Sequence, residues 1–483
     1  MSTTRVKEHH ALYGELAAIV GSKYTTDADF ALWAVSRDTS VMPEKIPGII
    51  VRPGSTEEVS EIVRLANLTN TPVIPRGGGA SLFGLPAGIP GRSLVIDLTR
   101  MDKIIEINEE NMTVTAEGGI TTSELGTKLI EKGYFANLAF MPYYADTLGG
   151  LLAGVYGAGA GHRLCTQGAN HHDVVGLKVV LPTGDVIQTG GGPGTNVHQK
   201  TTYTRECGSP DMTGMFLADA GIFGIKTEAT LLIYPHEKIF NSRSYLFDTF
   251  DDLWRALSTL QRIEPYPYTM MIGVDPKGAT AMTGQPSTSW VLLNALKGYT
   301  EEEIAAKVKA CAEVCKAAGG RPGTEVLNGL AAAANDGAML AEMGRFASLG
   351  SWNFLESVVS TQEAPRLFMK FREIIDGHIK EHGLEKYGVT RVDLLFPVQH
   401  NYYYSSTDVF WMDNSPDARK KFLELADVYN HLVANEGAFP GVHQRHPVES
   451  MASNWSPTFY NYVRTLKRTL DPNNIMNPGQ WRL

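Results

Sequence analysis

Glycine is concentrated in short stretches of this chain of 483 residues, and these stretches restrict its fold more than any other feature. The first is PRGGGASLFG at 75–84, and the second contains Gly149, Gly150, Gly154, Gly157, Gly159 and Gly161. Because glycine has no Cβ atom, such stretches can bring backbone N–H groups close to a ligand. Either stretch alone is also compatible with an ordinary turn or a flexible loop. Together with GIFGIKTEATL at 221–231, they predict contact with a large cofactor that contains phosphate or pyrophosphate.

Other classes of binding site are disfavoured by the sequence. The first glycine stretch has neither the GxxxxGK[ST] pattern of a Walker A loop nor a GxGxxG that leads into a helix. The four cysteines form no CxxC pair, and HRLCTQGANHHD at 162–173 lacks a standard zinc spacing, so we expect no metal site. The formal net charge of −9, with no basic block, argues against nucleic-acid binding.

The start and the hydropathy of the chain predict a cytoplasmic protein. The first residues, MSTTRVKEHHALYGEL, are polar, and no run of about 18 apolar residues is present to span a membrane. Hydrophobic residues make up 43% of the chain and charged residues 20%, which is enough apolar material for sizeable cores. This length predicts two or three domains.

Short apolar runs alternate with amphipathic segments, which predicts an α+β fold. In the first half we expect helices at 56–70 and 123–133, a hairpin at 174–192, and strands at 46–53, 71–79, 93–101, 112–119 and 221–235. From about residue 237 strands precede amphipathic helices, as in an antiparallel sheet with helices on one face. The expected domains are 1–236, 237–437 and a helical terminal segment at 438–483.

The order of these motifs resembles that of the vanillyl-alcohol oxidase and p-cresol methylhydroxylase family of flavoproteins. The matching segments are VRPGSTEEVSEIVRLAN, PRGGGASLFG, LVIDLTRMDKIIEI, TAEGGIT, DTLGGLLAG, VVGLKVVLPTGDVIQTG, DMTGMFLADAGIFGIKTEATL and LDPNNIMNPG. They follow the family's order over nearly the whole chain. The resemblance implies a two-subdomain FAD-binding domain of the p-cresol methylhydroxylase type and a ferredoxin-like α+β cap domain that binds substrate over the flavin.

The resemblance also implies which residues contact FAD. The first glycine loop would wrap the pyrophosphate with Pro75, Arg76, Gly77, Gly78, Gly79, Ala80, Ser81 and Leu82. The second segment would run beside the cofactor with Pro142, Thr147, Leu148, Gly149, Gly150 and Gly154. The third would pack near the flavin and ADP moieties with Gly221, Gly224, Ile225 and Thr227, and the terminal element would contribute Asn477.

Two branches of the family differ in the cap. The branch of D-2-hydroxyacid dehydrogenases and the flavin subunit of glycolate oxidase usually carries two segments in the cap, a metal-binding HGDGN-like segment and an EHG segment, and we expect neither in this chain. The stretch WMDNSPDARKKFLELADVYNHLVANEGAFPGVHQRHP is more similar to the branch of 4-cresol dehydrogenase and vanillyl-alcohol oxidase. There, the resemblance implies that Arg445 faces the substrate and holds a phenolate or carboxylate. An interdomain salt bridge is the alternative role for Arg445.

This sequence departs from the phenol-oxidising branch at several positions. Gln444 and Phe83 stand where relatives place two tyrosines that clamp a phenolate, and Gly154 stands where some place an acidic residue near flavin N5. The cap residue that anchors flavin covalently in relatives is also missing, with Trp352 in that region. We therefore expect dissociable FAD, and an aromatic or aliphatic alcohol, or a hydroxy acid, alongside a phenol as substrate.

The catalytic candidates in the cap are Arg445, His446, Tyr402 and Tyr404. On a strand, alternation places Tyr402 and Tyr404 on one face, where either could orient or deprotonate a hydroxyl group. His446 could accept a hydroxyl proton near neutral pH. Aromatic packing for the tyrosines and a structural role for His446 are the alternatives.

The sequence thus predicts an FAD-dependent oxidoreductase that moves a hydride from a hydroxylated or alkylphenol-type substrate to flavin N5. A D-2-hydroxyacid dehydrogenase of the lactate or glycolate type and a flavin-carrying electron-transfer subunit are the alternatives. The expected partners are a small-molecule substrate and an electron acceptor, which is oxygen, a cytochrome or another redox protein. A homo-oligomer is compatible with these expectations.

Overall fold

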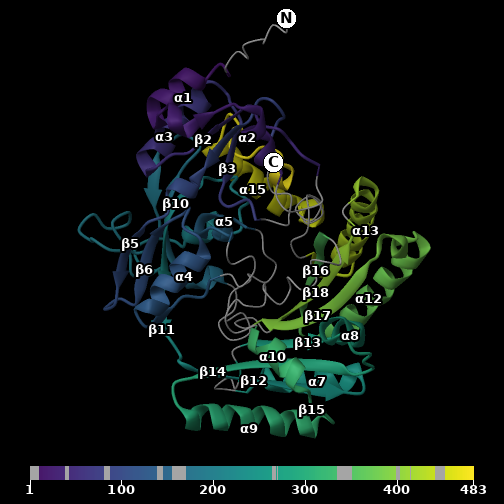
Figure 1. Ribbon diagram of the computed structural model, residues 1–483. Coiled ribbons are helices and arrows are strands. Elements are labelled where there is room, and N and C mark those ends of the chain that lie inside the picture. Colours follow the sequence, from purple (N-terminus) through teal and green to yellow (C-terminus); the bar gives the residue numbers. More distant parts are fainter. Residues whose placement is uncertain are drawn as a thin grey trace, which may run out of the picture.

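Two small sheets form the N-terminal half of the fold and one large sheet forms the C-terminal half (Figure 1). This computed structural model describes residues 10–37, 43–80, 88–138, 145–154, 170–263, 268, 270–333, 351–398, 403–413, 415–440 and 452–483. The mixture of helices and sheets confirms the predicted α+β class.

The first sheet has four strands in the order β1-β2-β4-β3, and its three longer strands run parallel. Its strands are β1 (Thr25–Thr26), β2 (Ile49–Val51), β3 (Val73–Arg76) and β4 (Leu94–Asp97), and its helices are α1 (Tyr13–Val20), α2 (Asp29–Ala34) and α3 (Thr56–Leu68). Helix α3 begins where predicted, because Ser55 Oγ accepts a hydrogen bond from the Glu58 N–H at 3.2 Å. Its apolar residues, among them Val59, Ile62 and Val63, are wholly buried against the sheet.

The second sheet has five antiparallel strands in the order β5-β6-β10-β8-β9. Its strands are β5 (Ile104–Asn108), β6 (Thr113–Glu117), β8 (Val174–Val180), β9 (Val186–Gln188) and β10 (Ile225–Leu232). Helices α4 (Thr122–Glu131) and α5 (Leu148–Ala153) belong to this half, as does the small pair β7 (Tyr134–Phe135) and β11 (Tyr234–Pro235). Strands β8 and β9 confirm the predicted hairpin.

One local prediction in this half was wrong. The strand expected at 93–101 ends at Asp97, whose carboxylate accepts hydrogen bonds from the Thr99 N–H and hydroxyl and turns the chain into a short 3₁₀ helix. The second glycine-dense stretch contains helix α5, for which the sequence pattern gave no prediction. A Cβ atom on Gly149 would lie 3.0 Å from the Gly118 carbonyl oxygen, so glycine lets this helix pack directly against backbone.

The large sheet has eight antiparallel strands in the order β15-β12-β14-β13-β17-β18-β16-β19. They are β12 (Ile239–Phe247), β13 (Met270–Val274), β14 (Trp290–Gly298), β15 (Arg321–Pro322), β16 (Ser351–Ser360), β17 (Thr390–Val398), β18 (Tyr403–Met412) and β19 (Phe439–Pro440). Its helices are α7 (Phe250–Leu260), α8 (Pro276–Thr283), α9 (Glu301–Ala317), α10 (Glu325–Ala333), α12 (Ala364–Glu381) and α13 (Pro416–Asn435). No helix in these described ranges is both long enough and apolar enough to cross a membrane.

Aromatic side chains fasten the helices of this half to one another and to the sheet. The Phe250 ring on α7 stacks on Phe368 of α12, with centroids 5.2 Å apart. Phe410 on β18 meets Phe422 of α13 edge-on at 5.3 Å. Figure 1 shows α12 and α13 on the side of the sheet that faces away from the N-terminal half. The antiparallel sheet that the sequence predicts after residue 237 is therefore present.

After the large sheet the chain returns to the N-terminal half through helix α15 (Pro457–Leu470) (Figure 1). The segment after this helix pairs with β3, where the Val73 N–H donates to the Ile475 carbonyl at 2.7 Å and the Asn477 N–H donates to the Val73 carbonyl at 2.8 Å. Buried Lys467 holds the segment in place, because its ammonium group donates to Asp471 and to the Met476 carbonyl.

We predict that Lys467→Met lowers the free energy of unfolding by about 3–5 kcal/mol, because it leaves Asp471 as a buried carboxylate without its cation. Urea unfolding followed by tryptophan fluorescence would measure this change. Arg468→Met is the matched control, since Arg468 is the next residue on the same helix and is exposed. Equal losses in the two variants would contradict the prediction.

Candidate functional site

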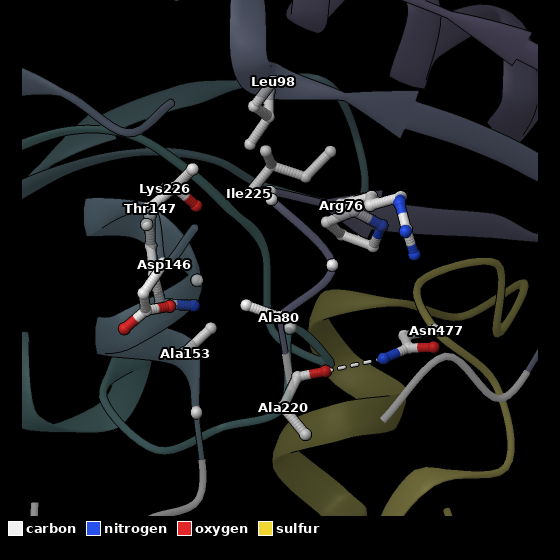
Figure 2. Close-up of a pocket in the computed structure, with 18 of the residues that line it drawn as sticks. Arg76, Ala80, Leu98, Asp146, Thr147, Ala153, Ala220, Ile225, Lys226 and Asn477 are labelled. Atoms are coloured by element: carbon white, nitrogen blue, oxygen red, sulfur yellow. Dashed lines mark hydrogen bonds between the residues drawn. The ribbon is translucent and has the colours of Figure 1, made fainter. Parts of the chain in front are cut away.

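One pocket lies where three segments of the N-terminal half meet the returning C-terminal segment (Figure 2). The segments are the end of β3 with its glycine loop, the start of α5, the turn before β10, and the chain around Asn477. The pocket is lined by Pro75, Arg76, Gly77, Gly78, Gly79, Ala80, Leu98, Asp146, Thr147, Gly149, Gly150, Ala153, Gly154, Ala220, Gly221, Gly224, Ile225, Lys226 and Asn477. Segments up to 400 residues apart in the sequence therefore build a single site.

The glycines at 77–79 are required by the close approach of two of these segments. A Cβ atom on Gly77 would overlap the Thr147 hydroxyl group, and one on Gly78 would overlap the Ala145 carbonyl group. Gly79 adopts a φ of +67°, which residues with a side chain rarely adopt. The first glycine stretch thus serves partly to pack against the second, a role that the sequence analysis did not assign to it.

A similar constraint holds the second sheet against the pocket. A Cβ atom on Gly118 would meet the Lys226 carbonyl oxygen, and one on Gly119 would overlap the Leu98 carbonyl group. The Gly149 N–H donates to the Gly118 carbonyl at 2.7 Å. Backbone therefore lies against backbone on several sides of the pocket, which leaves little side-chain bulk between its wall and a ligand.

Three buried polar atoms of the pocket residues have no hydrogen-bond partner within the described part of the chain. They are Asp146 Oδ2, Thr147 Oγ1 and Asn477 Oδ1. The orientation of the Asn477 amide is fixed, because its Nδ2 donates to the Ala220 carbonyl at 2.6 Å, which leaves the oxygen as an acceptor (Figure 2). Buried polar groups are nearly always paired in folded proteins, so these atoms indicate that a polar ligand completes the site.

The cationic side chains of the pocket are already engaged by the protein. Lys226 is 3% exposed and its ammonium group lies 2.7 Å from Asp219 Oδ1, in a buried ion pair. Asp219 also accepts a hydrogen bond from the Gly221 N–H, which fixes the turn before β10. Arg76 extends from the end of β3 and donates to the Arg37 carbonyl at 3.4 Å. A bound anion would therefore depend on main-chain N–H groups as well as on Arg76.

Most of the residues predicted to contact the cofactor line this pocket. They are Pro75, Arg76, Gly77, Gly78, Gly79, Ala80, Thr147, Gly149, Gly150, Gly154, Gly221, Gly224, Ile225 and Asn477. Leu148 and Thr227 lie behind the wall instead, because Leu148 is a core residue and the Thr227 hydroxyl bonds to Thr56 and Lys178. Ser81, Leu82 and Pro142 are outside the described residues.

The sequence analysis missed five residues of the lining, which are Leu98, Asp146, Ala153, Ala220 and Lys226. Asp146 directly precedes Thr147 in the second glycine segment, and Lys226 lies within the third. Both residues could therefore have been predicted from these motifs. Leu98 and the two alanines carry no chemical signal in the sequence. Their place in the lining follows from packing alone.

Of the predicted catalytic residues, only Tyr404 is among the residues that the structure describes. Arg445, His446 and Tyr402 lie outside the described residues, as do Phe83 and Gln444. Tyr404 is fully buried, and its ring packs against Trp254 of α7 with centroids 4.8 Å apart. Tyr404 therefore lies on the helix-covered face of the large sheet, which is not where a substrate-contacting side chain is expected.

No group of three or more His, Cys, Asp and Glu side chains is arranged to hold a metal ion in the part of the chain that the structure describes. A Glu-His-Gly sequence of the kind found in the hydroxyacid branch does occur, at Glu381–Gly383. It follows the end of α12, where the His382 and His378 rings lie with centroids 4.0 Å apart. This pair alone does not supply a metal site.

Comparison with known proteins shows which family this chain belongs to. Residues 47–190 match the family described as FAD binding domain, and residues 240–481 match the C-terminal domain of FAD linked oxidases. The chain belongs to the FAD-linked oxidase family. Most of the pocket residues lie within the FAD-binding match and Asn477 lies within the C-terminal match, whereas the pocket residues at 220–226 lie between the two matches.

One curated relative is the glycolate oxidase subunit GlcD of Bacillus subtilis, which is 27% identical over 270 residues. That alignment covers 56% of this chain and 53% of the relative, so the chain spans about half the length of the curated relative it matches. The chain also has the fold of two solved structures. They are 4-ethylphenol oxidase from Gulosibacter chungangensis (TM-score 0.80, 18% identity, 98% of each chain) and p-cresol methylhydroxylase (TM-score 0.77, 19% identity, 97% of this chain and 96% of that one).

The residues of the pocket fit FAD, the cofactor that the family implies. The glycine-dense wall gives the pyrophosphate access to main-chain N–H groups without interference from side chains. The partnerless oxygens of Asp146, Thr147 and Asn477 offer hydrogen bonds to the polar groups of a nucleotide. The comparisons bear out FAD as the predicted cofactor and the predicted fold with its FAD-binding domain and C-terminal domain.

We predict that Gly78→Ala lowers the free energy of unfolding by about 1–3 kcal/mol and reduces the flavin content of the purified protein, since the new methyl group forces the glycine loop away from Ala145. Denaturant unfolding and the ratio of flavin to protein absorbance would measure the two effects. The matched control is Gly14→Ala in α1, where a Cβ atom would meet nothing within 4 Å. The prediction fails if Gly78→Ala keeps the stability and flavin content of the control.

Proposed function

We propose that this protein is an FAD-dependent oxidoreductase that oxidises a hydroxylated or alkylphenol-type aromatic substrate by hydride transfer. The observation that carries the proposal is the glycine-walled pocket, with three polar atoms that no described residue pairs, in a chain whose two halves match FAD-linked oxidases. Bound FAD would supply the redox chemistry by accepting the hydride at N5. The protein would supply binding, orientation and the means to move the hydroxyl proton.

The N-terminal half would hold the cofactor. Main-chain N–H groups at 77–80 would face the pyrophosphate, and the Asn477 amide oxygen would accept a hydrogen bond from FAD. The described lining contains no histidine, cysteine or tyrosine. These are side chains through which flavins can be attached covalently, so their absence from this part of the wall supports a dissociable cofactor.

The cap would hold the substrate, through residues that lie outside the described ranges. Arg445 would offset the negative charge of a phenolate or carboxylate, and His446 or Tyr402 would take the proton of the substrate hydroxyl group as the carbon loses its hydride. The two electrons would then pass to oxygen, a cytochrome or another redox protein. Tyr404 is left out of this scheme because it is a core residue.

A D-2-hydroxyacid dehydrogenase is the second candidate, favoured by the similarity to the glycolate oxidase subunit GlcD. The same arrangement would serve it, because Arg445 can hold a carboxylate in the same way as a phenolate. The fold shared with 4-ethylphenol oxidase and p-cresol methylhydroxylase is compatible with either substrate class. The remaining alternative is a flavin carrier without a substrate of its own. In that case the flavin stays oxidised with every candidate substrate.

Anaerobic mixing with a substrate panel would test the proposed function. We expect an aromatic alcohol or 4-alkylphenol to bleach the flavin absorbance near 450 nm, whereas lactate and glycolate leave it unchanged. Bleaching by D-lactate or glycolate alone would instead assign the second candidate. If no compound of the panel reduces the flavin but dithionite does, the result would instead support the role of a flavin carrier.

We also predict that acid precipitation of the yellow protein releases its FAD into the supernatant. The basis is the described lining, which offers no side chain for a covalent link. Absorbance of the supernatant and mass spectrometry of the washed pellet would measure the two fractions. A flavin that stays with the denatured polypeptide would contradict a dissociable cofactor without affecting the family assignment.

A further inference from the structure

Asp146 occupies an unusual place in the wall of the FAD pocket. It lies just before helix α5, and its backbone carbonyl accepts a hydrogen bond from the Thr122 N–H at 2.9 Å. Helix α5 and this hydrogen bond together hold the backbone of Asp146 in place. Asp146 is one of the residues that line the pocket, yet it is only 7% exposed. Figure 2 shows it on the wall opposite Arg76 and Asn477.

The Asp146 carboxyl group lacks the support that a buried carboxylate needs. Its Oδ2 atom has no hydrogen-bond partner among the described residues. Burial raises the pKa of Asp146 to about 8, and a hydrogen bond from the Thr147 backbone opposes this shift in part. At pH 7 this side chain is therefore mostly a neutral acid, which has a proton to donate.

Neighbouring charges do not change this balance. Lys226 on β10 is neutralised by Asp219 at 2.7 Å. His171, which bonds to the Leu151 backbone of α5, is uncharged at pH 7 because burial lowers its pKa to about 4. Other charged residues on the adjoining segments include Arg76 at the end of β3, Glu117 at the end of β6 and Glu124 in the first turn of α4, and none of them shifts the pKa of Asp146.

A neutral acid suits this position because of the charge of the ligand. FAD carries two negative charges on its pyrophosphate, and a carboxylate in the same small pocket would repel them in surroundings where water screens little. A protonated carboxyl group avoids that repulsion and can donate to an oxygen or nitrogen acceptor of the cofactor. The pocket then presents a donor at Asp146 and an acceptor at Asn477 on opposite walls.

We propose that Asp146 binds FAD as a protonated carboxylic acid, donating a hydrogen bond to the cofactor, and that its ionisation weakens FAD binding. This inference rests on the proposed function, since it requires FAD to occupy this pocket. It adds a cofactor-binding residue and a pH dependence that neither the family assignment nor the glycine segments imply.

Equilibrium dialysis of the full-length protein against FAD between pH 7 and pH 9 would test the proposal. FAD has no ionising group of its own in this interval. Because the unliganded protein must keep its proton to bind, affinity falls as pH rises through the pKa of about 8, and we expect the Kd of the native protein to rise about tenfold over the interval. Asp146→Asn keeps a neutral donor of the same shape, so its Kd should change by less than about twofold.

Asp102→Asn is the matched control, because Asp102 is an exposed carboxylate outside the pocket, and it should reproduce the native pH curve. Circular dichroism would show whether each variant is folded, and Asp146→Ser, also a neutral donor, would replace an unfolded Asp146→Asn. A native Kd that stays constant from pH 7 to pH 9, or variants of Asp146 that follow the native curve, would overturn the inference alone. Failure of the native protein to bind FAD at any pH would overturn the proposed function as well.

Discussion

Direct contact between backbone segments without intervening side chains is the constraint on which this structure depends. The loop at 77–79 lies against 145–147, Gly119 lies against Leu98, and Gly118 lies against Lys226. Each of these three contacts leaves no space for a Cβ atom, so the segments pack at distances that only glycine permits. The pocket forms at their junction, and its wall therefore consists largely of main chain.

The polar groups of the pocket follow from the same packing. Bringing backbone segments together buries Asp146, Thr147 and Asn477, yet supplies no protein partner for one oxygen of each in the described part of the chain. Such a site is incomplete until a polar ligand enters. This accounts for the agreement between the geometry and the family match, in which the same half of the chain is an FAD-binding domain.

The extent to which sequence predicts this structure differs between its parts. Glycine positions and helix caps such as Ser55 act over a few residues, so the α+β class, helix α3 and most of the residues that line the described pocket could be predicted. The environment of Asp146 and the pairing of Lys226 with Asp219 depend on tertiary packing. Strand alternation placed Tyr404 on one face, but only the fold shows that helices cover that face.

The pairing of Val73 with the chain around Asn477 has a consequence for how the protein acquires its cofactor. The glycine loop of the pocket is translated early, whereas the Asn477 amide is contributed by a residue about 400 positions later. A nascent chain that ends before this residue lacks both the amide oxygen and the backbone contact with β3 that holds it. A pocket with its full described lining therefore exists only once the C-terminal segment has been synthesised and has paired with β3.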